Sequence, residues 1–253
     1  MNLGLIGHKL GHSYSKTYFE HKFEALQLHD ATYQLIELDG LNALPEAIER
    51  LHLDGFNVTI PYKRALLPLL DSLSPTASAV GAVNCVTVRW RGDGSYSLEG
   101  HNTDAPALLA TLRPLLQPWH RQALILGSGG AARAAAWALR QQGIGYCYVS
   151  RQPFDADLPD GEQVVGYDAL SAMPLQEFTL LINATPVGMH PSPDATPWPY
   201  PHLIGPRHLC YDLIYNPAPT LFLKEAALRG ATTKDGLEML HRQAELSWTL
   251  WNA

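Results

Sequence analysis

The chain of 253 residues lacks paired cysteines, clusters of basic residues and long hydrophobic runs. Its three cysteines, Cys85, Cys147 and Cys210, are far apart and form no CxxC pair. This spacing argues against a disulfide framework and against a thiolate zinc site. A reducing compartment is therefore expected.

Lysine and arginine are scattered along the chain, whose formal net charge is -6. No basic stripe indicates nucleic-acid binding, and no polybasic cluster indicates an anionic membrane surface. No segment reaches the about 18 consecutive apolar residues of a membrane span, and no signal peptide is evident. We therefore expect a cytoplasmic protein that acts on a small-molecule substrate, with neither nucleic acid nor membrane as a partner. For the assembly, a monomer or homodimer is expected.

Short apolar strands alternate with helical patterns in the first part of the chain, which is typical of an α/β fold. Strands are predicted at residues 3–7, 32–38, 56–60, 84–91 and 96–101, and helices at 15–28, 42–51, 62–70 and 74–80. The last two strands flank a Gly92-Asp93-Gly94 turn and predict a hairpin. A helix at residues 104–116 then leaves this first block.

A second alternating block begins at Gln122. Strands are predicted at residues 123–126, 145–150, 178–183 and 208–213, and helices at 131–142, 220–229 and 237–251. The proline-rich run from Pro186 to Pro206 excludes a regular helix or central strand and predicts a stiff surface loop. The block fits one nucleotide-binding unit, and the final helix is expected to pack back on the first block.

A glycine-rich turn joins the first strand and helix of the second block. The stretch LILGSGGAAR, residues 124–133, places Gly127, Gly129 and Ala132 in a GxGxxA arrangement. Gly127 permits a tight turn, Gly129 lets the backbone approach a pyrophosphate, and the helix amides face its charge. Dinucleotide binding is predicted, although such turns also occur between strands and helices for steric reasons alone.

The end of the next strand bears on which dinucleotide binds. That strand ends in Ser150 and Arg151, where an enzyme that selects NAD usually has an acidic residue. An arginine pairs with a 2′-phosphate, whereas a carboxylate repels it. NADP is favoured over NAD, and the alternative is that Arg151 only solvates the strand end.

Polar stretches follow three predicted strands of the first block, namely HSYS at 12–15, NVTIPYK at 57–63 and HNTD at 101–104. Ligands of α/β sheets bind at strand ends. Ser13 and Ser15 could present hydroxyls to a carboxylate, or they could simply cap the helix that follows. Taken alone, Lys63 is either a solvated strand cap or a cation held at a cleft.

The two histidines near the amino terminus do not indicate a metal site. His8 and His12 lie in a predicted loop without an evident third ligand, so a metal site is not expected.

Taken in order, the motifs resemble the shikimate dehydrogenase family along nearly the whole chain. They are GLIGHKLGHSYS (4–15), NVTIPYK (57–63), GAVN (81–84), HNTD (101–104), GSGGAAR (127–133), SR (150–151), NATPVGM (183–189), YDLIYNP (211–217) and DGLEMLHRQA (235–244). No single motif decides the family, but their common order argues against chance.

The resemblance implies an α/β protein with an N-terminal substrate-binding domain, residues 1–103 completed by 237–253, and a Rossmann-type NADP-binding domain, residues 104–236. It implies reversible NADP-dependent reduction of 3-dehydroshikimate to shikimate, a step toward aromatic amino acids, with Lys63 and Asp104 as the acid–base pair. The substrate would contact Ser13, Ser15, Thr59, Asn84, Gln243 and, on the nicotinamide side, Tyr215. The cofactor would contact Gly127, Ser128, Gly129, Gly130, Ala131, Ser150, Arg151, Thr185, Met189, Gly236 and Met239.

Two alternatives stay open at this point. A quinate or quinate/shikimate dehydrogenase that uses NAD acts on a substrate that differs by one ring hydroxyl and an alkene, which the motifs do not resolve. A non-catalytic NADP-binding sensor or scaffold could share the fold, although a binder has no need of Lys63 and Asp104.

Overall fold

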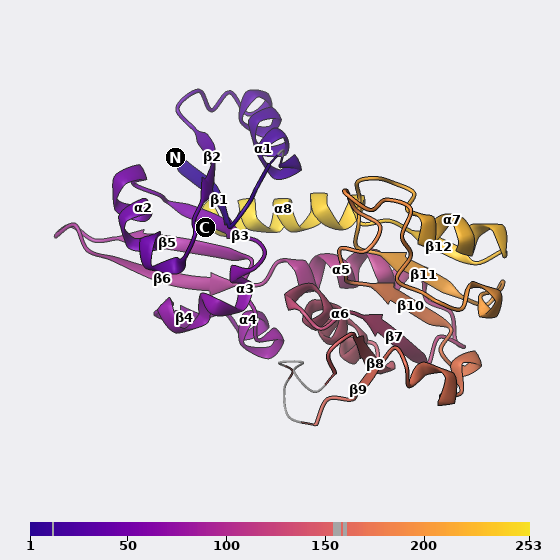
Figure 1. Cartoon of the computed structure of the whole chain (residues 1–253). Helices are drawn as coiled ribbons and strands as arrows, with labels where there is room; N and C mark the ends of the chain where they lie inside the picture. The colour runs from indigo at the N-terminus through magenta and orange to yellow at the C-terminus, as the bar shows by residue number, and fades with distance from the viewer. Residues whose placement is uncertain (12, 154–157, 159–160) are drawn as a thin grey trace. The chain divides into compact units, whose positions relative to one another are not determined.

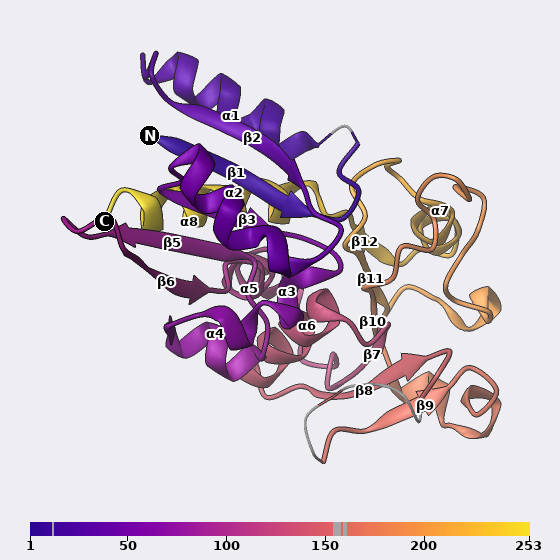
Figure 2. The same ribbon diagram turned by 60° about the vertical axis from the view of Figure 1, so that its left-hand side comes forward.

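The computed structural model describes residues 1–11, 13–153, 158 and 161–253, and it divides into two compact units (Figure 1, Figure 2). Unit 1 consists of Met1–Asp104 and His241–Ala253, and unit 2 consists of Ala105–Leu240. His12, in the first polar stretch, lies outside the described residues. Unit 1 is therefore built from two segments that unit 2 separates in the sequence.

Unit 1 contains a six-stranded mixed sheet with the strand order β2-β1-β3-β5-β6-β4. The strands are β1 (Asn2–Gly7), β2 (Thr32–Glu37), β3 (Gly55–Val58), β4 (Ser72–Leu73), β5 (Cys85–Trp90) and β6 (Tyr96–His101). β1 is parallel to β2 and β3, whereas β5 is antiparallel to β3 and to β6. The carboxyl ends of β1, β3 and β6 and the amino end of β5 therefore lie at one edge of the sheet.

Helices cover both faces of this sheet. On one face, α1 (Tyr14–Ala25) and the unit 1 part of α8 (Leu237–Trp251) share an apolar cluster that includes Phe19 and Trp251. On the other face, α2 (Leu44–Leu51), α3 (Tyr62–Ala65) and α4 (Pro75–Val80) pack with β-strand residues such as Phe56. Figure 2 shows α1 and α8 behind the strands and α2 in front of them.

The end of α8 fills a space that a glycine leaves open. A Cβ atom at Gly55 would lie 2.3 Å from the indole of Trp251, so a larger residue would displace that ring. The indole nitrogen of Trp251 also donates a hydrogen bond of 2.9 Å to the carbonyl of Val86. The predicted return of the last helix to the first block is confirmed.

Unit 2 contains a six-stranded sheet with the order β12-β11-β10-β7-β8-β9, and all its paired strands are parallel. Its elements are α5 (Asp104–Leu112), β7 (Gln122–Leu126), α6 (Gly130–Gln141), β8 (Gly145–Ser150), β9 (Val164–Gly166), β10 (Leu180–Asn183), β11 (Leu209–Asp212), α7 (Leu221–Leu228) and β12 (Thr232–Lys234). This is the strand order of a Rossmann fold, in which the direction of strand addition reverses between β7 and β10. The predicted α/β fold class is confirmed.

Two apolar clusters hold unit 2 together. On one face of the sheet, α5 and α6 contribute residues such as Leu108 and Ala135 to a cluster with Tyr148. On the other face, Phe222 of α7 packs with Cys147 and other strand residues. The strands are buried on both faces, as expected for a parallel sheet covered by helices.

Several local predictions need correction. The helices predicted at 62–70 and 104–116 end at Ala65 and Leu112, and each is followed by a 3-10 segment that contains a proline, which cannot donate the helical hydrogen bond. The 3-10 segments are η1 (Leu41–Ala43), η2 (Leu67–Leu69), η3 (Arg113–Leu115), η4 (Leu170–Ala172), η5 (Leu175–Glu177) and η6 (Pro201–Leu203). The sequence did not predict β4, β9 and β12, because two or three residues are too few to show a periodicity.

The proline-rich run is irregular, as predicted, but it is wrong to call it only a surface loop. Trp198 and Ile204 are buried in the cluster beneath it, with exposed fractions of 2% and 5%. Among the helices that the structure describes, none is long and apolar enough to cross a membrane.

Candidate active site

The polar stretches of unit 1 come together at one edge of its sheet. HSYS follows β1, NVTIPYK continues from β3, GAVN leads into β5, and HNTD continues from β6. Because β5 runs opposite to its neighbours, its beginning lies beside the ends of the other strands. The hairpin is therefore what brings Asn84 to the same edge as Lys63 and Asp104.

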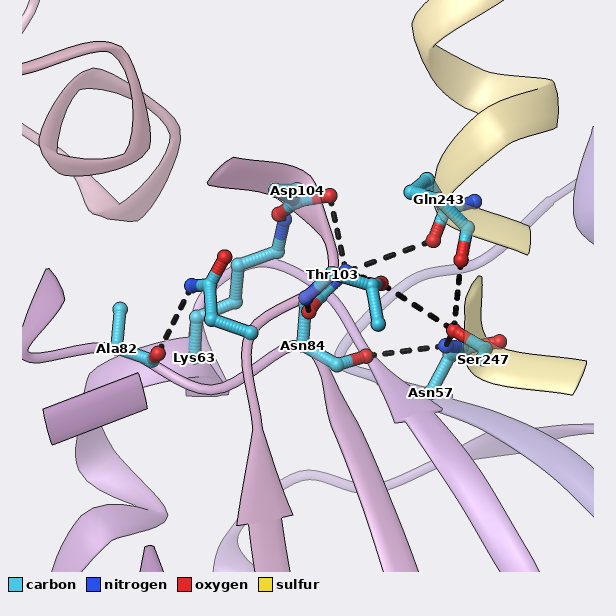
Figure 3. A network of polar contacts seen from close by, with 9 residues as sticks. Asn57, Lys63, Ala82, Asn84, Thr103, Asp104, Gln243 and Ser247 are labelled. Atoms are coloured by element: carbon cyan, nitrogen blue, oxygen red, sulfur yellow. Dashed lines mark hydrogen bonds and ion pairs between the residues drawn. The ribbon is translucent and has the colours of Figure 1, made fainter. Parts of the chain in front are cut away.

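Lys63 and Asp104 form an ion pair at this edge (Figure 3). Lys63 Nζ donates to Asp104 Oδ2 at 2.5 Å, and the exposed fractions of the two side chains are 19% and 9%. The backbone of Lys63 is fixed as well, because its carbonyl accepts a hydrogen bond of 2.7 Å from Val83 N. The pair is shielded but still reachable, which suits a group that exchanges protons with a ligand.

Asn84 lies at the centre of the contacts around this pair. Its amide nitrogen lies 2.9 Å from Asp104 Oδ1, 2.8 Å from Thr103 Oγ1 and 3.4 Å from Gln243 Oε1. Its amide oxygen accepts a hydrogen bond of 2.6 Å from Thr103 N. An amide has two N–H donors, so the three acceptors compete, and the long contact to Gln243 is the one most readily given up to a ligand.

A buried polar chain continues behind these residues and was not predicted from the sequence. Ser247 of α8, which is 0% exposed, accepts a hydrogen bond of 3.0 Å from Asn57 Nδ2 and lies 3.2 Å from Thr103 Oγ1. Asn57 Oδ1 accepts a hydrogen bond of 2.8 Å from the hydroxyl of Tyr33. In Figure 3, Gln243 and Ser247 project from successive turns of α8 toward the strand ends.

The sequence indicated these buried polar residues only weakly. Asn57 and Thr103 stand inside motifs that the sequence singled out, but they were given no role. Ser247 could have been found from its spacing, because residues four apart lie on the same helix face and Gln243 was already a candidate. Tyr33 carries no motif, since it reads as an ordinary buried strand residue.

The segment that carries Ser13 and Ser15 is connected to the same buried polar residues through Tyr33. Burial raises the pKa of Tyr33 well above its ordinary value and the nearby Cys85 raises it further, whereas a hydrogen bond with Ser15 lowers it. Ser13 occupies the N-cap position of α1, but its side chain makes no capping hydrogen bond. The capping alternative therefore does not account for the hydroxyl of Ser13.

Thr59 directly follows β3 and is partly buried. A Cβ atom at Gly7 would lie 2.7 Å from Thr59 Cγ2, so glycine at the end of β1 lets the two strand ends approach closely. The threonine is thereby held at the same sheet edge as Lys63.

Cys85 lies in this polar region but is not a nucleophile. Burial raises the pKa of its thiol to about 12, a hydrogen bond with Ser247 lowers it, and the Asp104 carboxylate raises it. A thiolate is the reactive form of cysteine. The protonated, fully buried thiol is therefore a packing residue.

Unit 2 presents a helix N-terminus after its first strand. Gly127 has a φ of +112°, and a Cβ atom there would lie 3.0 Å from the carbonyl of Ala184, so the turn requires glycine. Gly129 is the N-cap of α6, and a Cβ atom at Gly129 would meet nothing within 4 Å. Ser128, Gly130 and Ala131 complete this turn, whose open space and backbone amides fit a pyrophosphate.

The residues expected at the adenosine end follow β8. Ser150 is 8% exposed, and its hydroxyl accepts a hydrogen bond of 3.2 Å from Gln152 N. Arg151 is exposed, and its charge lowers the pKa of Tyr167, which burial raises. Arg151 is therefore available to an anionic group beside the β8 end.

Most residues expected at the nicotinamide side lie on loops after β10, β11 and β12, whereas Met239 lies in the first turn of α8. Thr185 donates hydrogen bonds to Asn183 Oδ1 from its backbone nitrogen at 3.0 Å and from its hydroxyl at 2.7 Å. Gly236 N donates to the carbonyl of Ile214 at 3.1 Å. Met189 is 39% exposed, Tyr215 is partly buried, and Met239 is only 7% exposed.

Within the described residues, no group of three or more histidine, cysteine, aspartate or glutamate side chains is placed to hold a metal ion. The ring of His8 lies 3.8 Å from Asp39. His12 lies outside the described part of the chain.

Comparisons with known proteins agree on one family. Residues 5–86 match the family model described as the shikimate dehydrogenase substrate binding domain. The chain is 37% identical to shikimate dehydrogenase (NADP(+)) from Microcystis aeruginosa, over 98% of this chain and 90% of that protein. It is 36% identical to shikimate 5-dehydrogenase from Thermus thermophilus, solved in complex with NADP(H) and shikimate, with a TM-score of 0.83 over 99% of this chain and 93% of that one. Quinate dehydrogenase from Corynebacterium glutamicum, solved with NAD, is 30% identical, with the same TM-score of 0.83 and coverage of 99% and 93%.

Proposed function

Because the chain belongs to the shikimate dehydrogenase family, we propose that it catalyses the reversible reduction of 3-dehydroshikimate to shikimate with NADPH. The observation that carries the proposal is the Lys63–Asp104 ion pair, held within the hydrogen bonds of Asn84. A protein that only binds a dinucleotide has no need of this pair. The alternative of a non-catalytic sensor is therefore not favoured.

We assign the substrate to unit 1. Its matched family model is that of a substrate binding domain, and the polar strand ends of HSYS, NVTIPYK, GAVN and HNTD all belong to it. Ser13 and Ser15 would bind the carboxylate, and hydroxyls of the ring would be bound by Thr59, Asn84, Asp104 and Gln243. Tyr215 is also a candidate substrate contact, on the nicotinamide side. Such fixed polar groups explain selectivity, because an analogue that lacks one hydroxyl leaves a buried group unpaired.

Lys63 is assigned the acid–base role. NADPH, when bound, would supply the hydride for the carbonyl carbon, and the substrate oxygen would then require a proton. The Lys63 ammonium donates that proton to the substrate oxygen, and the resulting amine is reprotonated from solvent. Asp104 holds the ammonium in place and stabilises its charge, while Asn84 fixes the other carboxylate oxygen of Asp104.

The cofactor is assigned to unit 2. The open space over Gly129 and the first amides of α6 fit a pyrophosphate, with Gly127, Ser128, Gly130 and Ala131 around it. Ser150 and Arg151 would bind the 2′-phosphate of NADP. The nicotinamide side would be formed by Thr185, Met189, Gly236 and Met239.

Absorbance of the reduced nicotinamide tests the proposal. The purified protein is incubated with shikimate or quinate and with NADP or NAD, in every combination. We expect the highest kcat/KM for shikimate with NADP. A preference for quinate with NAD would favour the activity named for the Corynebacterium glutamicum neighbour, and absence of turnover in all combinations would contradict an enzyme of this family.

Compartment and assembly stay predictions. The three free cysteines of unit 1 and unit 2 are buried, which is compatible with the reducing cytoplasm expected from their spacing. A monomer or homodimer is expected, and light scattering coupled to size-exclusion chromatography measures which of the two forms.

A further inference from the structure

A fully buried carboxylate ends β11 in unit 2 and has no part in the chemistry described above. Asp212 is 0% exposed and lies opposite Asn183, the last residue of β10, in the parallel register. Its Oδ1 accepts hydrogen bonds from Asn183 Nδ2 at 2.9 Å and from Ile214 N at 3.0 Å. Its Oδ2 accepts a hydrogen bond of 2.6 Å from the hydroxyl of Thr220.

Asn183 passes this constraint to the loop after β10. With its nitrogen held by Asp212 and also 3.2 Å from the carbonyl of Val187, its oxygen is turned toward Thr185. That oxygen accepts both hydrogen bonds of Thr185, whose hydroxyl in turn accepts one of 3.2 Å from Val187 N. One buried amide thus ties Thr185 and Val187, in the loop that also carries Met189, to Asp212.

The other contacts of Asp212 fix two further segments. Ile214 donates its backbone N–H to Asp212 and accepts a hydrogen bond from Gly236 N at 3.1 Å, and Tyr215 is the next residue. Thr220 caps α7 by accepting a hydrogen bond from Leu223 N. Every loop assigned to the nicotinamide side therefore has a hydrogen-bonded route to Asp212, whereas Ser150 and Arg151 lie on the other side of β7 in the strand order.

We infer that Asp212 is a positioning residue for the nicotinamide end of the cofactor, acting through Asn183 on Thr185 and through Ile214 on Tyr215 and Gly236. The inference rests on the proposed function, since it deepens the role of the cofactor site. Asp212 touches neither the substrate nor the cofactor in this role. It holds the loops that do.

Burial and hydrogen bonding have opposite effects on the charge of Asp212. Burial raises the pKa of its carboxyl to about 6, hydrogen bonds from Thr220, Ile214 and Asn183 lower it, and the Asp235 carboxylate raises it. Asp212 in turn raises the pKa of Cys210, after the larger effect of burial. A carboxylate accepts all of these donors at once, which a neutral aspartyl group cannot do as well.

The test separates the two ends of the cofactor. Calorimetry measures the Kd of NADP and of adenosine 2′,5′-bisphosphate, which lacks the nicotinamide, for wild type and for Asp212→Ala. We expect the Kd of NADP to rise by about tenfold, as for one lost hydrogen-bonded contact, and kcat to fall by about 100-fold, since a displacement of about 1 Å has that cost. The Kd of the bisphosphate should stay within about twofold, because its residues lie across the sheet.

Thr220→Val and Thr220→Ser form a second, milder pair in case Asp212→Ala does not fold. The valine removes the hydroxyl that Asp212 accepts, whereas the serine retains it, so only the valine variant should show the selective loss. Thr179→Val is a control at the opposite end of β10, where a buried hydroxyl donates to the carbonyl of Trp119 at 3.1 Å. It should leave both Kd values and kcat at the wild-type level.

Equal weakening of both ligands would overturn the inference, as would an Asp212→Ala protein with wild-type Kd for NADP and wild-type kcat. The inference would also be overturned if Thr220→Ser were as impaired as Thr220→Val in binding NADP. The comparison of ligands requires no turnover. The comparison of Kd values therefore still tests the inference if wild type binds NADP but does not oxidise shikimate. That result would contradict the proposed function.

Discussion

Lys63 Nζ and Asp104 Oδ2 lie 2.5 Å apart, although 41 residues separate them in the chain. Lys63 stands in the short helix after β3, and Asp104 is the first residue of the helix after β6. β5 lies between these two strands in the sheet and delivers Asn84 to the same place. Each charged group thus belongs to a different helix. The distance between Lys63 Nζ and Asp104 Oδ2 therefore depends on the sheet and not on one loop.

Replacing Lys63 tests its catalytic role. Lys63→Ala removes the proton donor, so kcat should fall by about 10² to 10⁴-fold, the usual contribution of general acid catalysis. The Kd of NADP should not change, because the cofactor residues belong to unit 2. Steady-state kinetics with calorimetry measures both quantities. Lys16→Ala is the control, since the Lys16 side chain is 44% exposed and pairs loosely with Glu20, at 3.7 Å. An increase in KM alone would make Lys63 a binding residue.

Removing the hydroxyl of Ser247 tests the buried polar chain. Ser247→Ala leaves Asn57 Nδ2 with one acceptor instead of two and removes the contact to Thr103. The free energy of unfolding of unit 1 should fall by about 1–3 kcal/mol, the cost of an unsatisfied buried group. Denaturant unfolding followed by tryptophan fluorescence measures it.

Thr249→Ala is the matched control for Ser247. Thr249 lies two residues further along α8, is exposed, and bonds to the carbonyl four residues earlier as Ser247 does. Its replacement should leave stability within about 0.5 kcal/mol of wild type. Similar losses in both variants would show that the helix bond, and not the chain of polar groups, carries the effect.

Arg151 should determine the preference for NADP. Arg151→Ala removes the cation expected at the 2′-phosphate, and hydrogen bonds to charged groups are worth about 1.5–3 kcal/mol. The KM for NADP should therefore rise by about ten- to 100-fold, with the KM for NAD unchanged. Arg121→Ala, at the exposed start of β7, provides the control. Equal changes for NADP and NAD would remove Arg151 from the 2′-phosphate site.

Asp212 should give the stability of the protein a distinct pH dependence. Its folded pKa is raised from 3.8 to about 6, mainly by burial, so the folded protein holds this proton more tightly than the unfolded chain. The stabilisation that the bound proton gives the folded protein is complete well below pH 3.8. It is lost as the pH rises through about 6. Relative to Asp212→Asn, wild type should lose about 2 kcal/mol between pH 4 and pH 8.

Urea unfolding of wild type and Asp212→Asn across that pH range measures the difference. Asp93→Asn provides a control of opposite sign, because hydrogen bonds from Ser95 lower the pKa of the exposed Asp93 carboxyl. Removing Asp93 should not reproduce the slope lost with Asp212. A pH-independent difference between wild type and Asp212→Asn would mean that folding does not shift the pKa of Asp212.

The sequence predicted the fold well where periodicity is long. The helix at 237–251 has the predicted bounds, because its apolar pattern extends over 15 residues, and the strand at 145–150 has them as well. The strand predicted at residues 56–60 ends two residues earlier, at Val58, since Thr59 and Ile60 have strand-forming side chains but Ile60 is 71% exposed. Side-chain preference alone does not show where a sheet ends.

The site was predicted from the order of motifs and not from contacts. Nothing local in the sequence connects Lys63 with Gln243, and their neighbourhood depends on the last helix returning to the first sheet. Motif matching also favours groups that touch ligands. It passed over Ser247 and Asp212, whose partners are other protein groups buried beneath the site.

The packing of Trp251 against Gly55 has a consequence for how the chain is made. During translation, all residues of unit 2 leave the ribosome before His241–Ala253, whereas the core of unit 1 needs Trp251 and the polar chain needs Ser247. The nascent dinucleotide-binding fold can therefore be complete while the first hundred residues still wait for their last helix. The first segment of unit 1 is thus synthesised first, but the substrate site to which it contributes is completed last.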